Sequence, residues 1–270
     1  MTHDPNDKFE QVRRPADHLG NVDDHRKNVD GFPAPNSLNP KAPSLLDAVT
    51  HTANISADFN RNYIVKDWLE RTALWMGFGP SNGGKSFLGL DLADHVAKGE
   101  EWGGRRGKKD RVLYVATESG TMFNNRILAL DSPEFWVLTV PMTFTGPNSQ
   151  AGPLSDVVQH LAKTGGDPID HIILDIMSRV MGALDEKNAP DIANLMRNLI
   201  QIRDATGAHI MLIHHSGKDV VRGARGHSSL RAAVDTEIEL SRDDLGQIAA
   251  EVTKQRDGPT GAKFVYTLRR

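Results

Sequence analysis

The sequence predicts a doubly wound α/β fold with a mostly parallel central sheet and a β-hairpin extension near its C-terminal end. Short apolar runs, typical of buried parallel strands, alternate with longer segments whose apolar residues recur at helical spacing. A glycine-rich loop stands between the first core strand and the first core helix. Together these patterns predict a site at the carboxyl ends of the strands.

Length and composition limit the possible classes of protein. A chain of 270 residues can hold one large α/β domain with extensions, or two small domains. It has no cysteine, which excludes disulfides and thiolate metal sites and suits a reducing compartment. We find no apolar run of membrane-spanning length and no signal-peptide core, and expect a soluble, cytoplasmic protein without a membrane partner. The formal charge of −3 excludes a uniformly basic nucleic-acid binder, so any DNA contact would come from a local basic stripe.

The chain divides at about residue 43. Residues 1–43 are polar and charged and carry six of the fourteen prolines. Such a segment buries too little apolar surface to offset its ordering entropy, so we expect a flexible arm. Residues 44–270 should form the folded domain, with a short helix and a loop over 44–62 and an entry into the core over 63–69.

The core elements follow in order. Strands are expected over 72–78, 112–116, 135–140, 171–175 and 209–214. Helices are expected over 85–98, 121–130, 154–163 and 191–205. Glycines stand where three of these helices should end, which are Gly99, Gly165-Gly166 and Gly207. Beyond them we expect a short helix over 228–233 and strands over 236–240, 248–255 and 263–268, the last two joined by a hairpin turn at Asp257–Gly261.

The glycine-rich stretch is the first candidate site. It reads Gly79-Pro80-Ser81-Asn82-Gly83-Gly84-Lys85-Ser86-Phe87. Glycines let successive backbone N–H groups converge on an anion, and the following helix directs its positive dipole end at it. A nucleoside triphosphate is the expected ligand, with Lys85 reaching the β- and γ-phosphates and the Ser86 hydroxyl binding Mg²⁺. A chance glycine-rich turn is the alternative.

Two carboxylates follow core strands. Asp175 closes the strand over 171–175, where it can bind Mg²⁺ or its water shell; a purely structural aspartate is the alternative. Glu118 follows the strand over 112–116. It can activate the attacking water as a general base, or it can cap the next helix, and the residues alone favour neither.

His214 and His215 end the fifth strand, and one of them can contact the γ-phosphate. Zinc binding by the pair is disfavoured, because adjacent strand residues point to opposite faces. The next loop carries Lys218, Arg222 and Arg225 among glycines. It is either a basic loop that contacts nucleic-acid phosphates or an ordinary solvated loop.

Lys254 and Arg256 lie just before the hairpin turn. In an oligomeric ATPase, cations from a neighbouring subunit can stabilise charge on the transferring phosphoryl group, as an arginine finger does. On a monomer, two cations at a hairpin tip would have no special meaning.

The order of these motifs resembles one family, the RecA-fold hexameric helicase ATPases, and most closely the RepA-type plasmid helicases and their phage relatives. The similarity covers about residues 63–270. Segments similar to phage primase-helicases and to the terminal hairpin of DnaB-type helicases are Arg225-Gly226-His227-Ser228-Ser229-Leu230-Arg231 and Lys254-Gln255-Arg256-Asp257-Gly258-Pro259-Thr260-Gly261.

The resemblance implies ATP and Mg²⁺ as cofactors, Glu118 as catalytic base, and His214 or His215 as γ-phosphate sensor. It also implies that Lys254 and Arg256 reach the ATP of an adjacent subunit. The segments after Asp175 and His215 would then be pore loops facing single-stranded DNA. There are departures: no primase or zinc module precedes the core, the N-terminal arm resembles no helicase linker domain, and His227 stands where serine is usual.

The main hypothesis is therefore a replicative DNA helicase, an ATP-hydrolysing hexameric ring that translocates on single-stranded DNA and works with other replication proteins. Two alternatives stay open. One is a RecA-like recombination or strand-annealing ATPase that forms filaments on single-stranded DNA. The other is an ATP-switched DNA-binding loader without unwinding activity.

Overall fold

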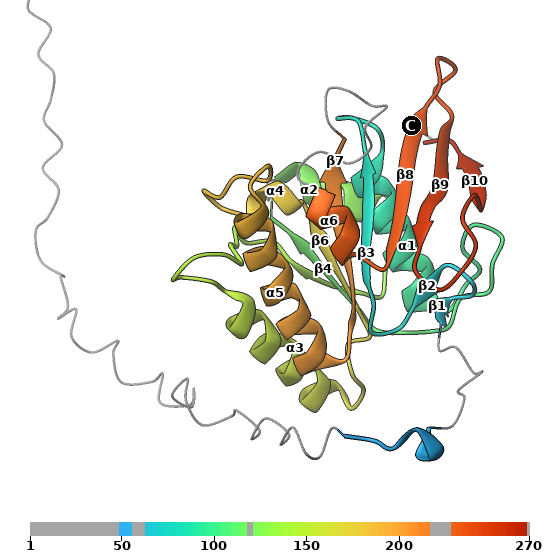
Figure 1. Cartoon of the computed structure of the whole chain (residues 1–270). Helices are drawn as coiled ribbons and strands as arrows, with labels where there is room; N and C mark the ends of the chain where they lie inside the picture. Colours follow the sequence, from blue (N-terminus) through green and yellow to red (C-terminus); the bar gives the residue numbers. More distant parts are fainter. Residues whose placement is uncertain (1–48, 56–62, 118–120, 217–227, 269–270) are drawn as a thin grey trace, which may run out of the picture. The chain divides into compact units, whose positions relative to one another are not determined.

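The computed structural model describes residues 49–55, 63–117, 121–216 and 228–268 (Figure 1). The chain divides into two compact units, Met1–Asp58 and Phe59–Arg270. The described part of the first unit contains a short 3-10 helix over Thr52–Asn54. The arm expected over residues 1–43 lies outside the described residues, and all elements below belong to the second unit.

An eight-stranded sheet forms the centre of the described part of the second unit, in the order β10-β9-β8-β3-β7-β6-β4-β5. The neighbours from β8 to β5 pair in parallel, and β8–β9 and β9–β10 pair antiparallel. The strands are β3 (Leu74–Gly79), β4 (Val112–Ala116), β5 (Trp136–Leu138), β6 (His171–Asp175), β7 (His209–His215), β8 (Thr236–Arg242), β9 (Ile248–Gln255) and β10 (Lys263–Tyr266). The predicted fold class, a mostly parallel α/β sheet with a C-terminal hairpin, is confirmed.

Helices cover both faces of the sheet, as α/β folds require. Met76 and Phe78 of β3 belong to the core cluster that includes residues of α3 and α5, and Trp75 belongs to the cluster on the other face, which includes residues of α1. The helices are α1 (Lys85–Lys98), α2 (Thr121–Leu128), α3 (Ala151–Gly165), α4 (Met177–Val180), α5 (Ala189–Thr206) and α6 (Ser228–Ala233). In the described part of the chain, no helix has the length and apolar character needed to cross a bilayer.

Several element boundaries differ from the sequence prediction. Helix α3 begins three residues before the expected 154, because Pro153 is tolerated in the first turn of a helix. Helix α5 begins at Ala189, where the Asn188 side chain accepts a hydrogen bond from the Asp191 amide and so caps the helix. The single turn α4 was not predicted, because four residues are too few to show a helical period. Strand β5 is shorter than the expected 135–140.

The parallel pairing brings the ends of four strands together. In β3, Gly79 lies opposite His215 of β7, and in β4, Ala116 lies opposite Asp175 of β6. Strand β7 lies between β3 and β6, so the histidine pair lies beside the strand bearing Asp175. The loop after β3 and the carboxylate after β6 therefore share one edge of the sheet.

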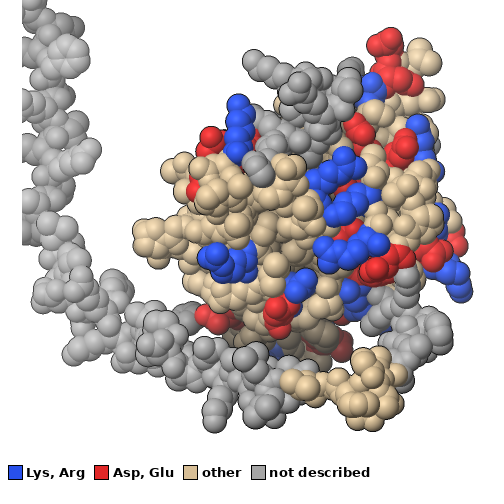
Figure 2. All heavy atoms as spheres, viewed as in Figure 1, with Lys and Arg blue, Asp and Glu red and all other residues tan. Residues whose placement is uncertain are grey.

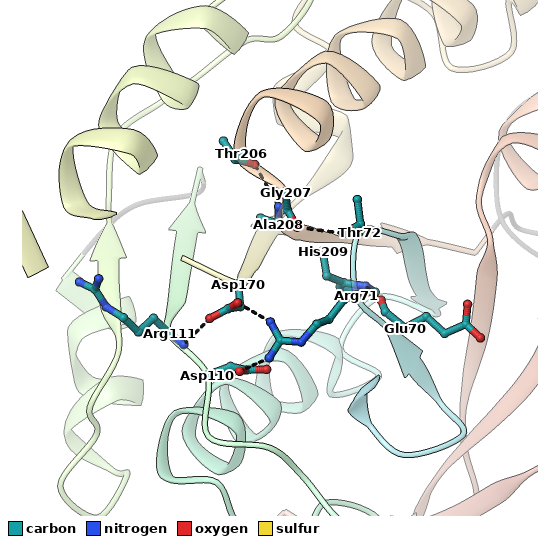
Figure 3. A network of polar contacts seen from close by, with 10 residues as sticks. All are labelled: Glu70, Arg71, Thr72, Asp110, Arg111, Asp170, Thr206, Gly207, Ala208 and His209. Atoms are coloured by element: carbon teal, nitrogen blue, oxygen red, sulfur yellow. Dashed lines mark hydrogen bonds and ion pairs between the residues drawn. The ribbon is translucent and has the colours of Figure 1, made fainter. Parts of the chain in front are cut away.

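A polar network closes the opposite edge (Figure 3). Arg71 follows a small antiparallel pair, β1 (Tyr63–Val65) and β2 (Leu69–Glu70), and its guanidinium binds the carboxylates of Asp110 and Asp170. Burial raises the pKa of the Asp110 carboxyl, and the Arg71 charge opposes this shift. The network joins the segments that precede β3, β4 and β6, and so fixes the start of the parallel sheet.

Candidate functional site

The loop between β3 and α1 has the geometry of a phosphate-binding loop. The Gly83 amide donates a hydrogen bond to the Pro80 carbonyl at 3.0 Å, and the Leu88 amide donates to the Gly84 carbonyl at 2.9 Å. Asn82 and Gly84 have left-handed backbones, with φ of 61° and 85°. Two left-handed residues turn the chain sharply, so that helix α1 begins directly over the end of β3.

Glycine is required at position 84 for a second reason. A Cβ there would lie only 2.5 Å from Cδ1 of Ile248 on β9. The loop therefore packs directly against the C-terminal hairpin. This contact keeps the loop backbone at the start of α1. Backbone amides at a helix N-terminus are suited to binding anionic oxygens.

Lys85 lies over this loop rather than in solvent. The residue is only 6% exposed, and its ammonium donates to the carbonyls of Gly79 and Pro80 at 3.2 and 2.7 Å. Phe87, in contrast, is 41% exposed, and the Arg126 guanidinium of α2 lies 5.4 Å from the centre of its ring. The start of α1 thus carries a buried cation and an exposed aromatic ring that contacts an arginine.

Asp175 is held by groups from β4. It is buried, and its Oδ2 accepts a hydrogen bond from the Tyr114 hydroxyl at 2.7 Å. Its main-chain carbonyl accepts bonds from the amide and hydroxyl of Thr117, at 2.7 and 2.9 Å. These bonds orient the carboxylate at the end of β6, on the face of the sheet that carries α1.

The Ser86 hydroxyl and the Asp175 carboxylate are oxygen ligands of the kind that Mg²⁺ prefers. Among the described residues, no group of three or more His, Cys, Asp or Glu side chains is arranged to hold a metal ion. A magnesium ion bound mainly by nucleotide phosphates and water does not need such a group. The glycine loop and this donor pair fit a magnesium–nucleotide complex.

The two histidines at the end of β7 point in different directions. His214 is fully buried, and its Nε2 lies 4.0 Å from Oε2 of Glu186, in the segment after α4. His215 lies opposite Gly79 in the register, and the next amide, of Ser216, donates to the Gly79 carbonyl at 2.8 Å. Since side chains alternate along a strand, His215 shares its face with α1 and Asp175.

Lys254 and Arg256 lie at the edge of the sheet opposite the loop. The Lys254 ammonium donates to the carbonyls of Arg231 and Val234 at 2.6 and 2.7 Å, at the end of α6. The Arg256 guanidinium pairs with Asp235 at 2.7 Å, and Asp235 also accepts the amide of Leu74 at the start of β3.

Strand β3 therefore separates these cations from the phosphate loop by roughly 16 Å, at about 3.3 Å per residue. Burial lowers the pKa of Lys254, and the neighbouring Arg256 charge acts in the same direction. Lys and Arg side chains gather around α6 and the adjacent strands on the face shown in Figure 2. The side chains of Arg231 in α6 and Arg256 after β9 are each 54% exposed.

Four predicted site residues, Glu118, Lys218, Arg222 and Arg225, lie outside the described residues. Their assignments as catalytic base and DNA contacts stay predictions. The sequence prediction also missed Tyr114 and Glu186, which contact predicted site residues. A tyrosine within an aliphatic strand was the available signal for Tyr114, because a buried phenol needs a hydrogen-bond partner.

This fold and this loop define an α/β protein of the P-loop nucleotide-binding class. The chain belongs to the AAA domain family, which matches residues 40–220. Among solved structures, the crystal structure of the RadB recombinase is similar, with 17% sequence identity and a TM-score of 0.49, covering 74% of this chain and 88% of that chain. No curated protein matches the sequence.

Proposed function

We propose that this protein is an ATP-hydrolysing motor that assembles into a hexameric ring, moves along single-stranded DNA and acts as a replicative helicase. The observation that carries this proposal is the position of Arg256. It lies at the far edge of the sheet from the phosphate loop of its own chain and is half exposed. An arginine there is out of reach of its own nucleotide but is available to that of a neighbour.

Within one chain, each site residue has a distinct role. The loop amides and Lys85 bind the phosphates, and Ser86 and Asp175 hold the magnesium ion and its water shell. A bound Mg²⁺ would neutralise charge on the β- and γ-phosphates. Glu118 would accept the proton of the attacking water, and His215 is favoured over His214 as the residue that detects the γ-phosphate, because it faces α1.

The two cations near the hairpin turn are not equivalent in this proposal. Arg256 is held by one carboxylate, that of Asp235, and its own side chain is 54% exposed, so a single ion pair opposes its movement toward a neighbour. Lys254 would have to leave the carbonyl groups that it binds at the end of α6. We therefore assign the finger role first to Arg256, and expect Lys254 mainly to hold α6 in place.

The DNA contacts are assigned to the basic loop that follows His215. Lys218, Arg222 and Arg225 would bind backbone phosphates, with affinity that falls as salt increases. In the sequence, this basic segment begins two residues after the proposed sensor and ends where α6 begins. A change at the γ-phosphate would thus have a short covalent route to the DNA.

A mixing experiment tests whether the active site is shared. Arg256→Ala should abolish hydrolysis while ATP binding stays close to normal, and Lys85→Ala should abolish binding. Mixed assemblies of the two variants should recover activity, because some interfaces then combine an intact loop with an intact finger. No recovery at any ratio, with mixed assembly confirmed by native mass spectrometry, would contradict action between subunits.

A strand-displacement assay tests the helicase assignment, with Glu118→Gln as the control that binds ATP without turnover. We expect ATP-dependent unwinding by the wild type only. Absence of unwinding under conditions that support ring assembly and ATP turnover would contradict the proposal. Electron microscopy with single-stranded DNA adds a second criterion, since closed rings support a helicase and continuous filaments indicate a recombination ATPase.

A further inference from the structure

Tyr114 lies between the two residues assigned to the magnesium ion, Ser86 and Asp175. It lies in the middle of β4 and is fully buried. Its hydroxyl lies 2.7 Å from Oδ2 of Asp175 and 3.5 Å from the main-chain carbonyl of Ser86. A phenol has a single hydrogen, and both neighbours are acceptors, so the shorter distance identifies Asp175 as the acceptor.

The surrounding structure holds the phenol at this position. The Tyr114 ring packs against Phe123 of α2, with ring centroids 5.4 Å apart. On the other side lies Gly89 of α1, where a Cβ would be 3.4 Å from the phenol oxygen and 2.9 Å from Cδ1 of Ile213. Glycine is unfavourable inside a helix. At Gly89 it lets α1 approach β4 and β7 closely enough for the phenol to reach both Asp175 and Ser86.

The hydrogen bond from the Tyr114 hydroxyl to Oδ2 fixes the rotation of the Asp175 carboxylate about its Cβ–Cγ bond. The direction in which the second carboxylate oxygen points is fixed with it.

We propose that Tyr114 is a positioning residue that fixes the Asp175 carboxylate in the orientation that holds Mg²⁺ and its water shell. The inference rests on the magnesium–nucleotide site of the proposed function. Groups that hydrogen-bond a metal-binding residue typically change metal affinity by about 10- to 100-fold when removed. Tyr114 should therefore set the magnesium affinity of the site and have little effect on the binding of metal-free nucleotide.

Tyr114→Phe is a sharp test, because it removes one oxygen and keeps the packed ring. The readout is binding of a fluorescent N-methylanthraniloyl-ADP to the full chain at increasing Mg²⁺, without turnover. We expect the Mg²⁺ midpoint of the variant to rise by about tenfold or more, with metal-free affinity unchanged. A midpoint within twofold of the wild type would overturn the proposal.

Tyr63→Phe is the matched control. Tyr63 lies in β1, beside the segment that precedes β4 and at the edge of the sheet away from the phosphate loop. The Mg²⁺ midpoint of this variant should stay at the wild-type value, and an equal shift in both variants would contradict a specific role of Tyr114. In an Asp175→Asn background, Tyr114→Phe should produce no further shift, because both changes then act on the same carboxylate. Additive shifts would mean that Tyr114 acts by another route.

Failure of the proposed function would give a different result in the same nucleotide-binding assay from failure of the Tyr114 proposal. Wild-type protein whose nucleotide binding is insensitive to Mg²⁺ would contradict the magnesium–nucleotide site itself. If Tyr114→Phe does not fold, carbon-13 NMR of tyrosine-labelled wild type replaces it, with signals assigned from Tyr63→Phe and Tyr266→Phe. The Tyr114 signal should move when Mg²⁺ is added to the ADP-bound protein, and an unmoved signal would overturn the proposal.

Discussion

The buried histidines on β6 and β7 predict a marked loss of stability in mild acid. His171 and His209 stack with ring centroids 4.9 Å apart and are both buried. Nδ1 of His209 lies 2.7 Å from the Glu70 carbonyl, and this bond requires a proton on Nδ1. Burial lowers the pKa of His209 to about 4, although the bond to Glu70 opposes the shift.

The sign and size of the change in the free energy of unfolding with pH follow from proton linkage. A histidine whose pKa is lowered by folding binds fewer protons in the folded state than in the unfolded state, so stability falls as the pH drops below the unfolded pKa. With a folded pKa of about 4 against about 6.5 in the unfolded chain, His209 alone should cost about 2 kcal/mol between pH 8 and pH 5. Burial lowers the pKa of His171 well below its usual value, with a smaller contribution from His209, so it adds to the loss in the same direction.

Urea unfolding at pH 8, 7, 6 and 5 measures this effect, followed by tryptophan fluorescence. Trp75 is a local reporter, since its ring centroid lies 6.4 Å from that of His209. His209→Asn retains a donor near the Nδ1 position. It should lower stability at pH 8 because of the lost volume, and should reduce the difference between pH 8 and pH 5 by about 2 kcal/mol.

His160→Gln is the control, because His160 is exposed on α3 and its replacement should leave the pH dependence as in the wild type. The reasoning would be refuted if His209→Asn lost as much stability between pH 8 and pH 5 as the wild type.

Two further predictions concern the network and the loop. Arg71→Met should lower the free energy of unfolding in urea by about 3–5 kcal/mol, because it leaves the buried Asp110 carboxylate without its cation. Lys109→Met, at an exposed ion pair, is the control and should change this free energy by less than about 1 kcal/mol. Equal effects of the two substitutions would contradict the argument. Gly84→Ala should cost at least about 1–2 kcal/mol from its left-handed backbone alone. Ile248→Ala removes the steric contact but is itself destabilising, because Ile248 is fully buried. The double variant should therefore be less stable than Ile248→Ala alone by the backbone cost, and equal stability of the two would contradict the backbone argument.

Much of the fold was readable from the sequence, because parallel strands and helices carry different apolar patterns. The run over His171–Asp175 is buried at every position, and its strand has the predicted bounds. The predicted end of α1 at Lys98 is confirmed, and α5 ends at Thr206, one residue later than predicted. Gly99 and Gly207 follow these ends with left-handed backbones. Strand order was not predictable, because the pairing of β3 with both β7 and β8 depends on side-chain packing between distant segments.

The candidate site was readable only where local sequence determines geometry. The loop over Gly79–Ser86 needs its glycines whatever surrounds it, so its position could be predicted. The contact of Lys254 with the end of α6 could not, because it joins residues 20 or more positions apart through main-chain carbonyls, which leave no trace in residue type. The same holds for the bond from Tyr114 to Asp175, which spans 61 positions.

Strand β9 has a mechanical consequence for an assembly of this chain. One end, at Ile248, touches the glycine that begins α1, and the other end leads directly to Arg256. Strand β9 is paired with β8 along its length and with β10 over residues 248–251. An extended strand held in this way does not stretch, so displacement at one end is carried to the other over about 24 Å, at about 3.4 Å per residue. In the proposed ring, β9 would be a rigid connection between the ATP bound by its own chain and the ATP bound by the neighbouring subunit. The order in which the subunits hydrolyse ATP would then depend on the stiffness of this single strand.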